Sequence, residues 1–220
     1  MKKKVVATLA MALFMFVMTG VAKASSIWTD WTDRTVGATG SVTGTLGTIA
    51  VNYSGECLSA TNINGTSNIW NPDTTYIGGF IDTSPNAVGD VIGLNGSTIV
   101  STLSFSEPIS NPVIAIWSLG APSVSASFSF DEASTFQVGG PNSKYGGSSI
   151  IIDGNIVTGK EGNGVILFEG EFNSLSWTST NENWYGFTVG STSVPIPGAV
   201  WLLGSGLAGL AGTRIRRKKK

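Results

Sequence analysis

The stretch Pro112-Val113-Ile114-Ala115-Ile116-Trp117-Ser118-Leu119 decides the fold of this 220-residue chain. It is an almost continuous apolar run, and it is too short for a helix between Pro112 at its start and Gly120-Ala121-Pro122 after its end. An apolar run of this length without polar alternation predicts a strand that is buried on both faces. Such a strand belongs in the middle of a covered sheet.

The segments before this run read as two hairpins. Residues 41–46 and 48–54 flank Gly47, and residues 91–94 and 97–105 flank Asn95-Gly96, a dipeptide that favours a tight hairpin turn. In the second hairpin we expect three side chains on the buried side, namely Ile99, Leu103 and Phe105.

The segments after the run continue the strand pattern. Val124, Ala126, Phe128 and Phe130 alternate with serines, which predicts a strand with one buried face. Further strands are expected at 135–138, 149–152, 156–157, 165–169, 172–178 and 184–189, with a turn at Asp153-Gly154. About ten strands without any helical apolar period predict an all-β ectodomain over residues 25–193, a single β-sandwich of jelly-roll-like type with Greek-key connections.

The N-terminal 24 residues have the pattern of a signal peptide. Lys2-Lys3-Lys4 precedes a 13-residue apolar segment, 5–17, and Ala22-Lys23-Ala24 forms a small-x-small cleavage site. We expect cleavage between Ala24 and Ser25. The alternative is an uncleaved N-terminal anchor, for which the apolar segment is short.

The C-terminal 27 residues have three parts. Val194-Pro195-Ile196-Pro197 comes first, and an apolar segment at about 198–213 follows, which predicts a short transmembrane helix. The basic tail 214–220 then favours retention of the C-terminus in the cytoplasm. The cations of this membrane stop are Arg214, Arg216, Arg217, Lys218, Lys219 and Lys220.

This order of motif, apolar segment and basic tail resembles a PEP-CTERM sorting domain, in the variant where Val-Pro-x-Pro replaces Val-Pro-Glu-Pro. Ile196 stands where the founding motif has Glu. The resemblance implies that exosortase, a membrane protease-transpeptidase, recognises residues 194–197 and removes the tail. It also implies a Gram-negative host that makes extracellular polysaccharide.

A second resemblance concerns the last half of the ectodomain. The blocks 111–120, 161–170, 175–178 and 182–190 resemble uncharacterised ectodomains of PEP-CTERM proteins. This similarity implies membership of that group and no particular activity.

Charge and residue usage exclude several classes of function. Residues 25–193 carry three cations, Arg34, Lys144 and Lys160, against all 14 Asp and Glu residues, so their net charge is −11. Such an acidic product repels nucleic acid, and we expect no nucleic-acid partner. The chain has no His, which excludes Ser-His-Asp and Cys-His catalysis and His-ligated metals. The single Cys57 forms no internal disulfide and is expected to be buried.

Three sets of residues are candidates for a site. Trp28, Trp31 and Trp70 lie in polar contexts and are the candidates for an exposed platform that stacks on sugar rings, whereas Trp117, Trp177 and Trp184 are assigned to the core. Glu169 and Glu171, two apart on one expected strand, would share a face as glycosidase carboxylates do, with a solvated edge as the alternative.

Calcium is the third candidate, because it takes oxygen ligands and needs no His. The carboxylates that would contribute are Asp30, Asp33, Asp131, Glu132, Asp153 and Glu161. No ligand is assigned, and we expect no cofactor and no catalytic residue.

These observations predict an exported protein with the inner membrane, signal peptidase and exosortase as partners. We expect a membrane-anchored precursor and then a cell-surface or extracellular-matrix product. That product would be a structural or adhesive component associated with exopolysaccharide, as in a biofilm. The alternatives are a carbohydrate-binding module and a carboxylate-based glycoside hydrolase or lyase.

Overall fold

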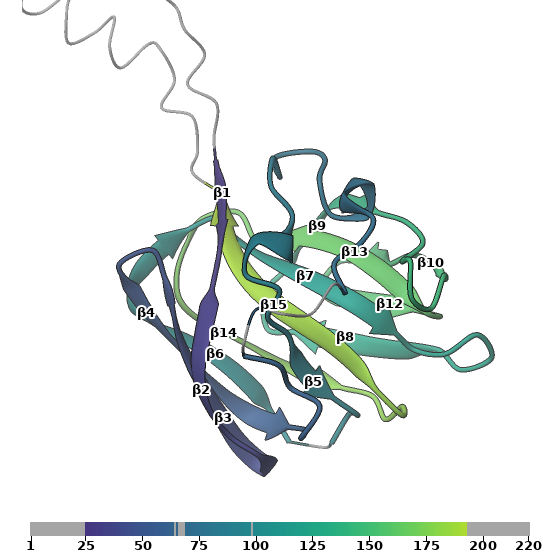
Figure 1. Cartoon of the computed structure of the whole chain (residues 1–220), viewed down its shortest axis with the longest axis horizontal. Coiled ribbons are helices and arrows are strands. Elements are labelled where there is room, and N and C mark those ends of the chain that lie inside the picture. Colours follow the sequence, from purple (N-terminus) through teal and green to yellow (C-terminus); the bar gives the residue numbers. More distant parts are fainter. Residues whose placement is uncertain (1–24, 64, 66–68, 98, 193–220) are drawn as a thin grey trace, which may run out of the picture. The chain divides into compact units, whose positions relative to one another are not determined.

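A computed structural model of the chain describes residues 25–63, 65, 69–97 and 99–192. The described residues form an all-β structure with fifteen strands and two single-turn 3-10 helices, η1 (Asp73–Thr75) and η2 (Pro85–Ala87). The strands make two sheets, which confirms the expected all-β class (Figure 1).

The first sheet has seven strands. Its order is β1 (Ser26–Trp28), β15 (Tyr185–Thr192), β7 (Pro112–Leu119), β13 (Gly162–Leu167) and β10 (Ser148–Ser149). Two further strands belong to this sheet. Strand β5 (Ile92–Leu94) pairs with β15, and β9 (Thr135–Gly139) pairs with β13. Strands β10 and β13 are parallel, whereas the other pairs are antiparallel.

The second sheet has eight strands, all paired in antiparallel fashion. Its order is β11 (Ile151–Asp153), β12 (Ile156–Gly159), β8 (Ala126–Phe130), β14 (Glu171–Ser179), β6 (Ser101–Ser110), β4 (Ile49–Cys57), β3 (Gly37–Leu46) and β2 (Asp30–Thr35).

The main core lies between the two sheets and is rich in aromatic rings. Trp177 of β14 and Tyr53 of β4 pack with Phe187 of β15, with ring centroids 5.1 Å and 5.3 Å from the Phe187 centroid. Because side chains of both sheets bury the same cluster, the architecture is that of a β-sandwich. Cys57 is buried in this core as a free thiol, as expected.

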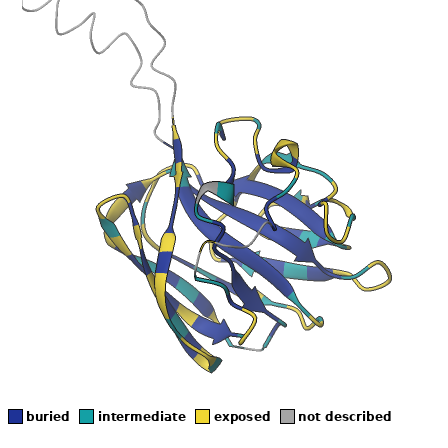
Figure 2. Cartoon of the chain, in the orientation of Figure 1, coloured by how far each residue is buried: buried dark blue, intermediate teal, exposed yellow. Residues whose placement is uncertain are grey.

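Strand β7 confirms the prediction that the apolar run 112–119 is a strand buried on both faces. Ile114 and Ile116 point into the core between the sheets, whereas Val113, Ala115 and Trp117 belong to a second cluster on the outer face of the first sheet. All eight residues of β7 are buried, and the strand is dark blue along its length in Figure 2. The connection between β4 and β5 contributes Ile69, Trp70, Tyr76 and Ile81 to the outer cluster.

The expected hairpin at Asn95-Gly96 is wrong. Leu94 of β5 pairs with Tyr185 in the first sheet, whereas β6 pairs with β4 and β14 in the second sheet. Asn95-Gly96 therefore crosses from one sheet to the other. The buried Glu56 fixes this crossing, because its Oε2 accepts backbone N–H bonds from Asn95, Gly96 and Ser97 at 2.9, 2.9 and 3.3 Å.

Other expectations divide in a similar way. The hairpin around Gly47 is confirmed as β3–β4, and Asp153-Gly154 joins β11 to β12. Leu103 and Phe105 are buried as expected, whereas Val124 is 46% exposed. The single strand expected at 149–152 is two strands, β10 and β11, which lie in different sheets. Strands β1 and β2 were not predicted.

The two terminal segments lie outside the described residues. They are residues 1–24, for which we expect a signal peptide, and residues 194–220, for which we expect a sorting signal. Within the described part of the chain, no helix has the length and apolarity needed to cross a bilayer.

Candidate functional site

The expected sugar platform at Trp28, Trp31 and Trp70 is wrong, because all three side chains are buried. Their exposed fractions are 7%, 0% and 0%, which leaves no ring face for a ligand. Each indole N–H also has an acceptor inside the fold. Trp28 Nε1 donates to Thr83 O at 2.8 Å, Trp31 Nε1 to Thr188 Oγ1 at 3.0 Å, and Trp70 Nε1 to Asp90 O at 3.0 Å.

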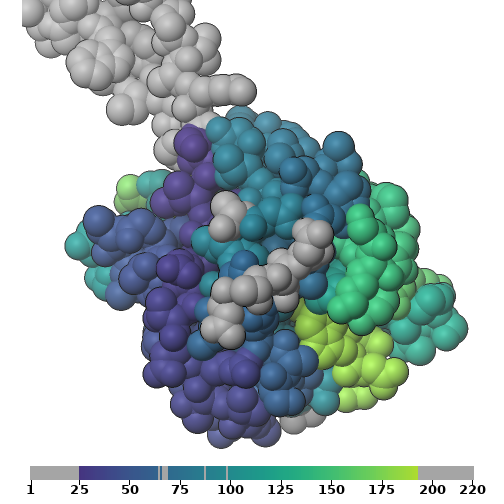
Figure 3. All heavy atoms as spheres, viewed as in Figure 1, coloured from purple at the N-terminus to yellow at the C-terminus, as the bar shows by residue number. Residues whose placement is uncertain are grey.

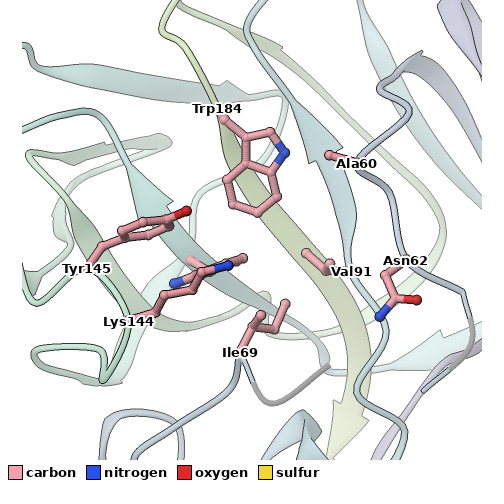
Figure 4. Close-up of a pocket in the computed structure, with 8 residues that line it drawn as sticks. Ala60, Asn62, Ile69, Val91, Lys144, Tyr145 and Trp184 are labelled. Atoms are coloured by element: carbon pink, nitrogen blue, oxygen red, sulfur yellow. The ribbon is translucent and has the colours of Figure 1, made fainter. Parts of the chain in front are cut away.

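A different group of aromatic residues lines a pocket on the outer face of the first sheet. The pocket has a volume of about 240 Å³. Its lining comes from the β4–β5 connection, from β7, from the β9–β10 connection and from the residue before β15. The lining residues are Ala60, Asn62, Ile69, Val91, Trp117, Lys144, Tyr145 and Trp184 (Figure 4).

The Trp117 ring contacts two of the other rings in the lining, those of Tyr145 and Trp184. Trp117 and Tyr145 stack with a centroid distance of 5.5 Å and an interplanar angle of 15°, and Trp184 meets Trp117 edge-on at 4.6 Å and 74°. Figure 4 shows Trp184 on one side of the pocket and Ile69 on the opposite side. In the space-filling view of Figure 3, the green segment around the β9–β10 connection adjoins the yellow-green segment that leads into β15.

Lys144 is the cation at the rim of the pocket. Its Nζ lies 5.3 Å from the ring centroid of Trp117 and 5.3 Å from that of Tyr145. This position allows a cation–π interaction with both rings. Among the described residues, Lys144 makes no ion pair with a carboxylate.

The loop that carries Lys144 and Tyr145 is held at both ends. Asn142 is buried, and its Nδ2 donates to Ile69 O at 2.6 Å and to Tyr76 Oη at 3.1 Å. Asn142 and Gly146 exchange backbone hydrogen bonds of 2.7 and 2.8 Å. Asn163 of β13 then donates from Nδ2 to Gly146 O at 3.1 Å. The two exposed side chains thus stand on a fixed backbone.

Two residues with an unusual backbone conformation, Ser118 and Glu161, lie next to the segments that support this loop. Ser118 and Glu161 have φ angles of 58° and 53°, in the left-handed region that side chains other than Gly seldom adopt. The Ser118 hydroxyl donates to the Glu161 carboxylate, and Ser118 N donates to Asn163 Oδ1 at 2.8 Å. The irregular ends of β7 and β13 therefore position Asn163, and through it the Lys144–Tyr145 loop.

Of the residues that the structure describes, Lys144 is the one charged residue in the pocket lining, and carboxylates lie in the segments next to it. Glu182 Oε2 accepts from Trp184 N at 3.1 Å, and Asp90 directly precedes the lining residue Val91. Burial raises the pKa of Asp90 above its ordinary value of 3.8, against the lowering effect of backbone N–H bonds from Trp31 and Gly65. Glu161 adds a third carboxylate near the loop.

Two donors in the pocket walls have no acceptor in the described part of the chain. The indole N–H groups of Trp117 and Trp184 are buried without a hydrogen-bond partner there. Buried polar groups are nearly always paired in folded proteins, so each such group calls for an explanation. In Figure 4 the Trp184 nitrogen lies on the side of the ring nearer Ala60.

The acidic candidates do not form a site. Glu169 and Glu171 are both exposed, as the solvated-edge alternative has it, and they flank Gly170 between the end of β13 and the start of β14. The expectation that they share a face of one strand is therefore wrong. Among the described residues, no three carboxylates or thiols come close enough to hold a metal ion.

The sequence signals at the two ends are not described by the structure. These are Ala22 and Ala24 of the cleavage site, the motif 194–197 and the basic tail. Ser25, the expected new N-terminus, is exposed, and β1 begins at the next residue.

The pocket was not predicted because Trp117 and Trp184 were assigned to the core and no role was assigned to Lys144 or Tyr145. One signal was present, since Lys144 is one of only three cations between residues 25 and 193. No family model, curated protein or solved structure matches this chain.

Proposed function

We propose that this chain is an exported protein of the cell surface or extracellular matrix that exosortase processes, and that its β-sandwich is a structural or adhesive component associated with exopolysaccharide. The observation that carries the proposal is the order Val194-Pro195-Ile196-Pro197, apolar segment and basic tail at the C-terminus. The signal-peptide pattern at the N-terminus agrees with it.

The positions of the first and last described strands support this proposal. Strand β1 begins at Ser26, one residue after the expected new N-terminus, and its Ser26 N donates to Asp82 Oδ1 at 2.6 Å. Strand β15 ends at Thr192, two residues before the motif. Both expected cuts therefore fall next to the β domain, so that processing would remove both termini without removing a strand.

Replacement of the two motif prolines tests the processing step. The double change Pro195→Ala and Pro197→Ala removes the rigid backbone that the recognition element offers, so the precursor should accumulate uncut in membranes. The control is Pro122→Ala, which lies in an exposed turn. Normal maturation of the double variant would contradict exosortase recognition, and immunoblots of membrane and matrix fractions measure it.

A second candidate function, a carbohydrate-binding module, is favoured by the aromatic pocket. Flat aromatic rings present a negative face to the C–H groups of a sugar ring, while the ammonium of Lys144 offers polar contacts at the same pocket. A pull-down of the protein with the exopolysaccharide of its host measures this function. The enzyme alternative has no comparable support, since Glu169 and Glu171 lie in solvent.

A further inference from the structure

We propose that the pocket between Trp117, Trp184 and Tyr145 binds a single neutral pyranose ring at the end of a polysaccharide chain. The proposal rests on the carbohydrate-binding function above and specifies its site and its ligand class.

The size of the pocket sets the length of the ligand. Its volume of about 240 Å³ is below the ~300–1,000 Å³ of sites for drug-sized ligands. One sugar ring is of the matching size, whereas a run of several rings is not. The pocket is therefore suited to a chain end or a side branch.

The chemistry of the lining matches a sugar ring, which has an apolar C–H face and a hydroxyl edge. The Tyr145 ring, which is 52% exposed, and the half-buried Trp184 ring offer apolar contact, and the buried Trp117 ring stacks on Tyr145 with a centroid distance of 5.5 Å. At the rim, the Lys144 ammonium carries three donors.

Lys144 lies over the Trp117 ring and has to move when a ligand enters. Its side chain is exposed and bound only to ring faces, so its displacement is cheap compared with that of a buried ion pair. The backbone of the loop stays fixed through Asn142 and Asn163. The site thus combines an anchored loop with one movable side chain.

The charge around the pocket selects a neutral ring over an acidic one. Two carboxylates, those of Glu161 and Glu182, are hydrogen-bonded to Ser118 and to Trp184 in the segments that line or support the pocket, against the single ammonium of Lys144. Residues 25–193 also carry a net charge of −11. A uronic acid would approach against this field, whereas a neutral hexose would not.

The test uses the full-length protein in detergent and follows its tryptophan fluorescence during titration with methyl glycosides of neutral hexoses and of glucuronic acid. We expect at least one neutral glycoside to bind saturably, with glucuronide binding weaker. Tyr145→Ala should weaken that binding about tenfold because it removes the exposed partner of the Trp117 stack. Lys144→Ala should weaken the binding as well, because it removes the ammonium donors at the rim of the pocket.

Two matched controls lie away from the pocket lining. Phe80→Ala removes a ring that is 59% exposed, compared with 52% for Tyr145, and Lys160→Ala removes another exposed ammonium. Both should bind as the unaltered protein does.

The outcomes separate the site from the function. If polysaccharide binds in the pull-down but Tyr145→Ala and Lys144→Ala bind equally well, sugar binding stands and the pocket assignment falls. Tighter binding of the glucuronide than of any neutral glycoside would overturn the neutral ligand class. If no sugar binds in either assay, the carbohydrate-binding function and the pocket assignment fail together, and export and processing are judged by the motif variant alone.

Discussion

At the scale of single residues, two buried carboxylates accept hydrogen bonds from backbone N–H groups and so fix segments of the chain. Glu56 fixes the crossing from β5 to β6, and Asp90 accepts N–H bonds from Trp31 at 2.8 Å and from Gly65 at 2.7 Å. Each carboxylate replaces a sheet partner with charge-assisted hydrogen bonds. Both residues look like ordinary surface acids in the sequence.

Glu56→Ala is expected to destabilise the protein. The change leaves the N–H groups of residues 95–97 without their acceptor, which should lower the free energy of unfolding by about 3 kcal/mol. Urea denaturation measures the change, with Glu107→Ala on the exposed face of β6 as the control. A loss for Glu56→Ala no greater than that for Glu107→Ala would show that the crossing does not depend on this carboxylate.

Asp90 makes a specific prediction about pH. Because burial raises its pKa in the folded state, folded Asp90 binds a proton more readily than unfolded Asp90 does. Its contribution to stability is therefore complete below the unfolded pKa, about 3.8, and is lost as the pH rises through the higher folded pKa. The free energy of unfolding of the unaltered protein minus that of Asp90→Asn should fall over this range.

Urea denaturation at a series of pH values measures this difference. Asp33→Asn, at an exposed position of β2, serves as the matched control for the Asp-to-Asn change itself. A difference between the unaltered protein and Asp90→Asn that rises with pH would contradict the raised pKa of Asp90.

At the scale of elements, β7 is the strand on which both clusters depend. Ile116→Ala would open a cavity between the sheets and should cost about 2–5 kcal/mol of unfolding free energy. Val124→Ala, at a side chain that is 46% exposed beyond the end of β7, should cost less than about 0.5 kcal/mol. Thermal or urea unfolding compares the two, and equal losses would contradict a central position of β7.

The elements also explain what the sequence could predict. The period of β8 and the unbroken apolar run of β7 report burial directly, so both strands were found with the correct faces. Asn95-Gly96 has the local chemistry of a hairpin, but the partner of β5 is β15, some ninety residues away. Long-range pairing and the buried acceptor Glu56 override the local signal there.

The prediction that Trp31 and Trp70 are exposed was wrong for the same reason. Polar neighbours suggested exposure for Trp31 and Trp70, yet Thr188 and Asp90, which are distant in sequence, supply acceptors for their indole N–H groups. Trp117 was correctly placed in a buried strand. That its ring also forms the wall of a pocket depends on the loop around Tyr145, which only the folded structure brings to it.

At the scale of the whole molecule, we propose an acidic β-sandwich with a removable sorting signal at each terminus. The leader and the tail together hold ten of the 13 cations, so removal of both would turn a nearly neutral precursor into a product with a net charge of −11. That charge keeps the product soluble and away from anionic membrane surfaces. We propose that contact with polysaccharide is made by the aromatic pocket on the outer face of the first sheet.

The intact mass of the protein, measured separately in membrane and extracellular-matrix fractions, tests the proposed double processing most directly. We predict a matrix species that starts at Ser25 and ends within Val194 to Pro197. A species that starts at Ser25, keeps Lys220 and occurs only in membranes would contradict it and make the chain an anchored surface protein.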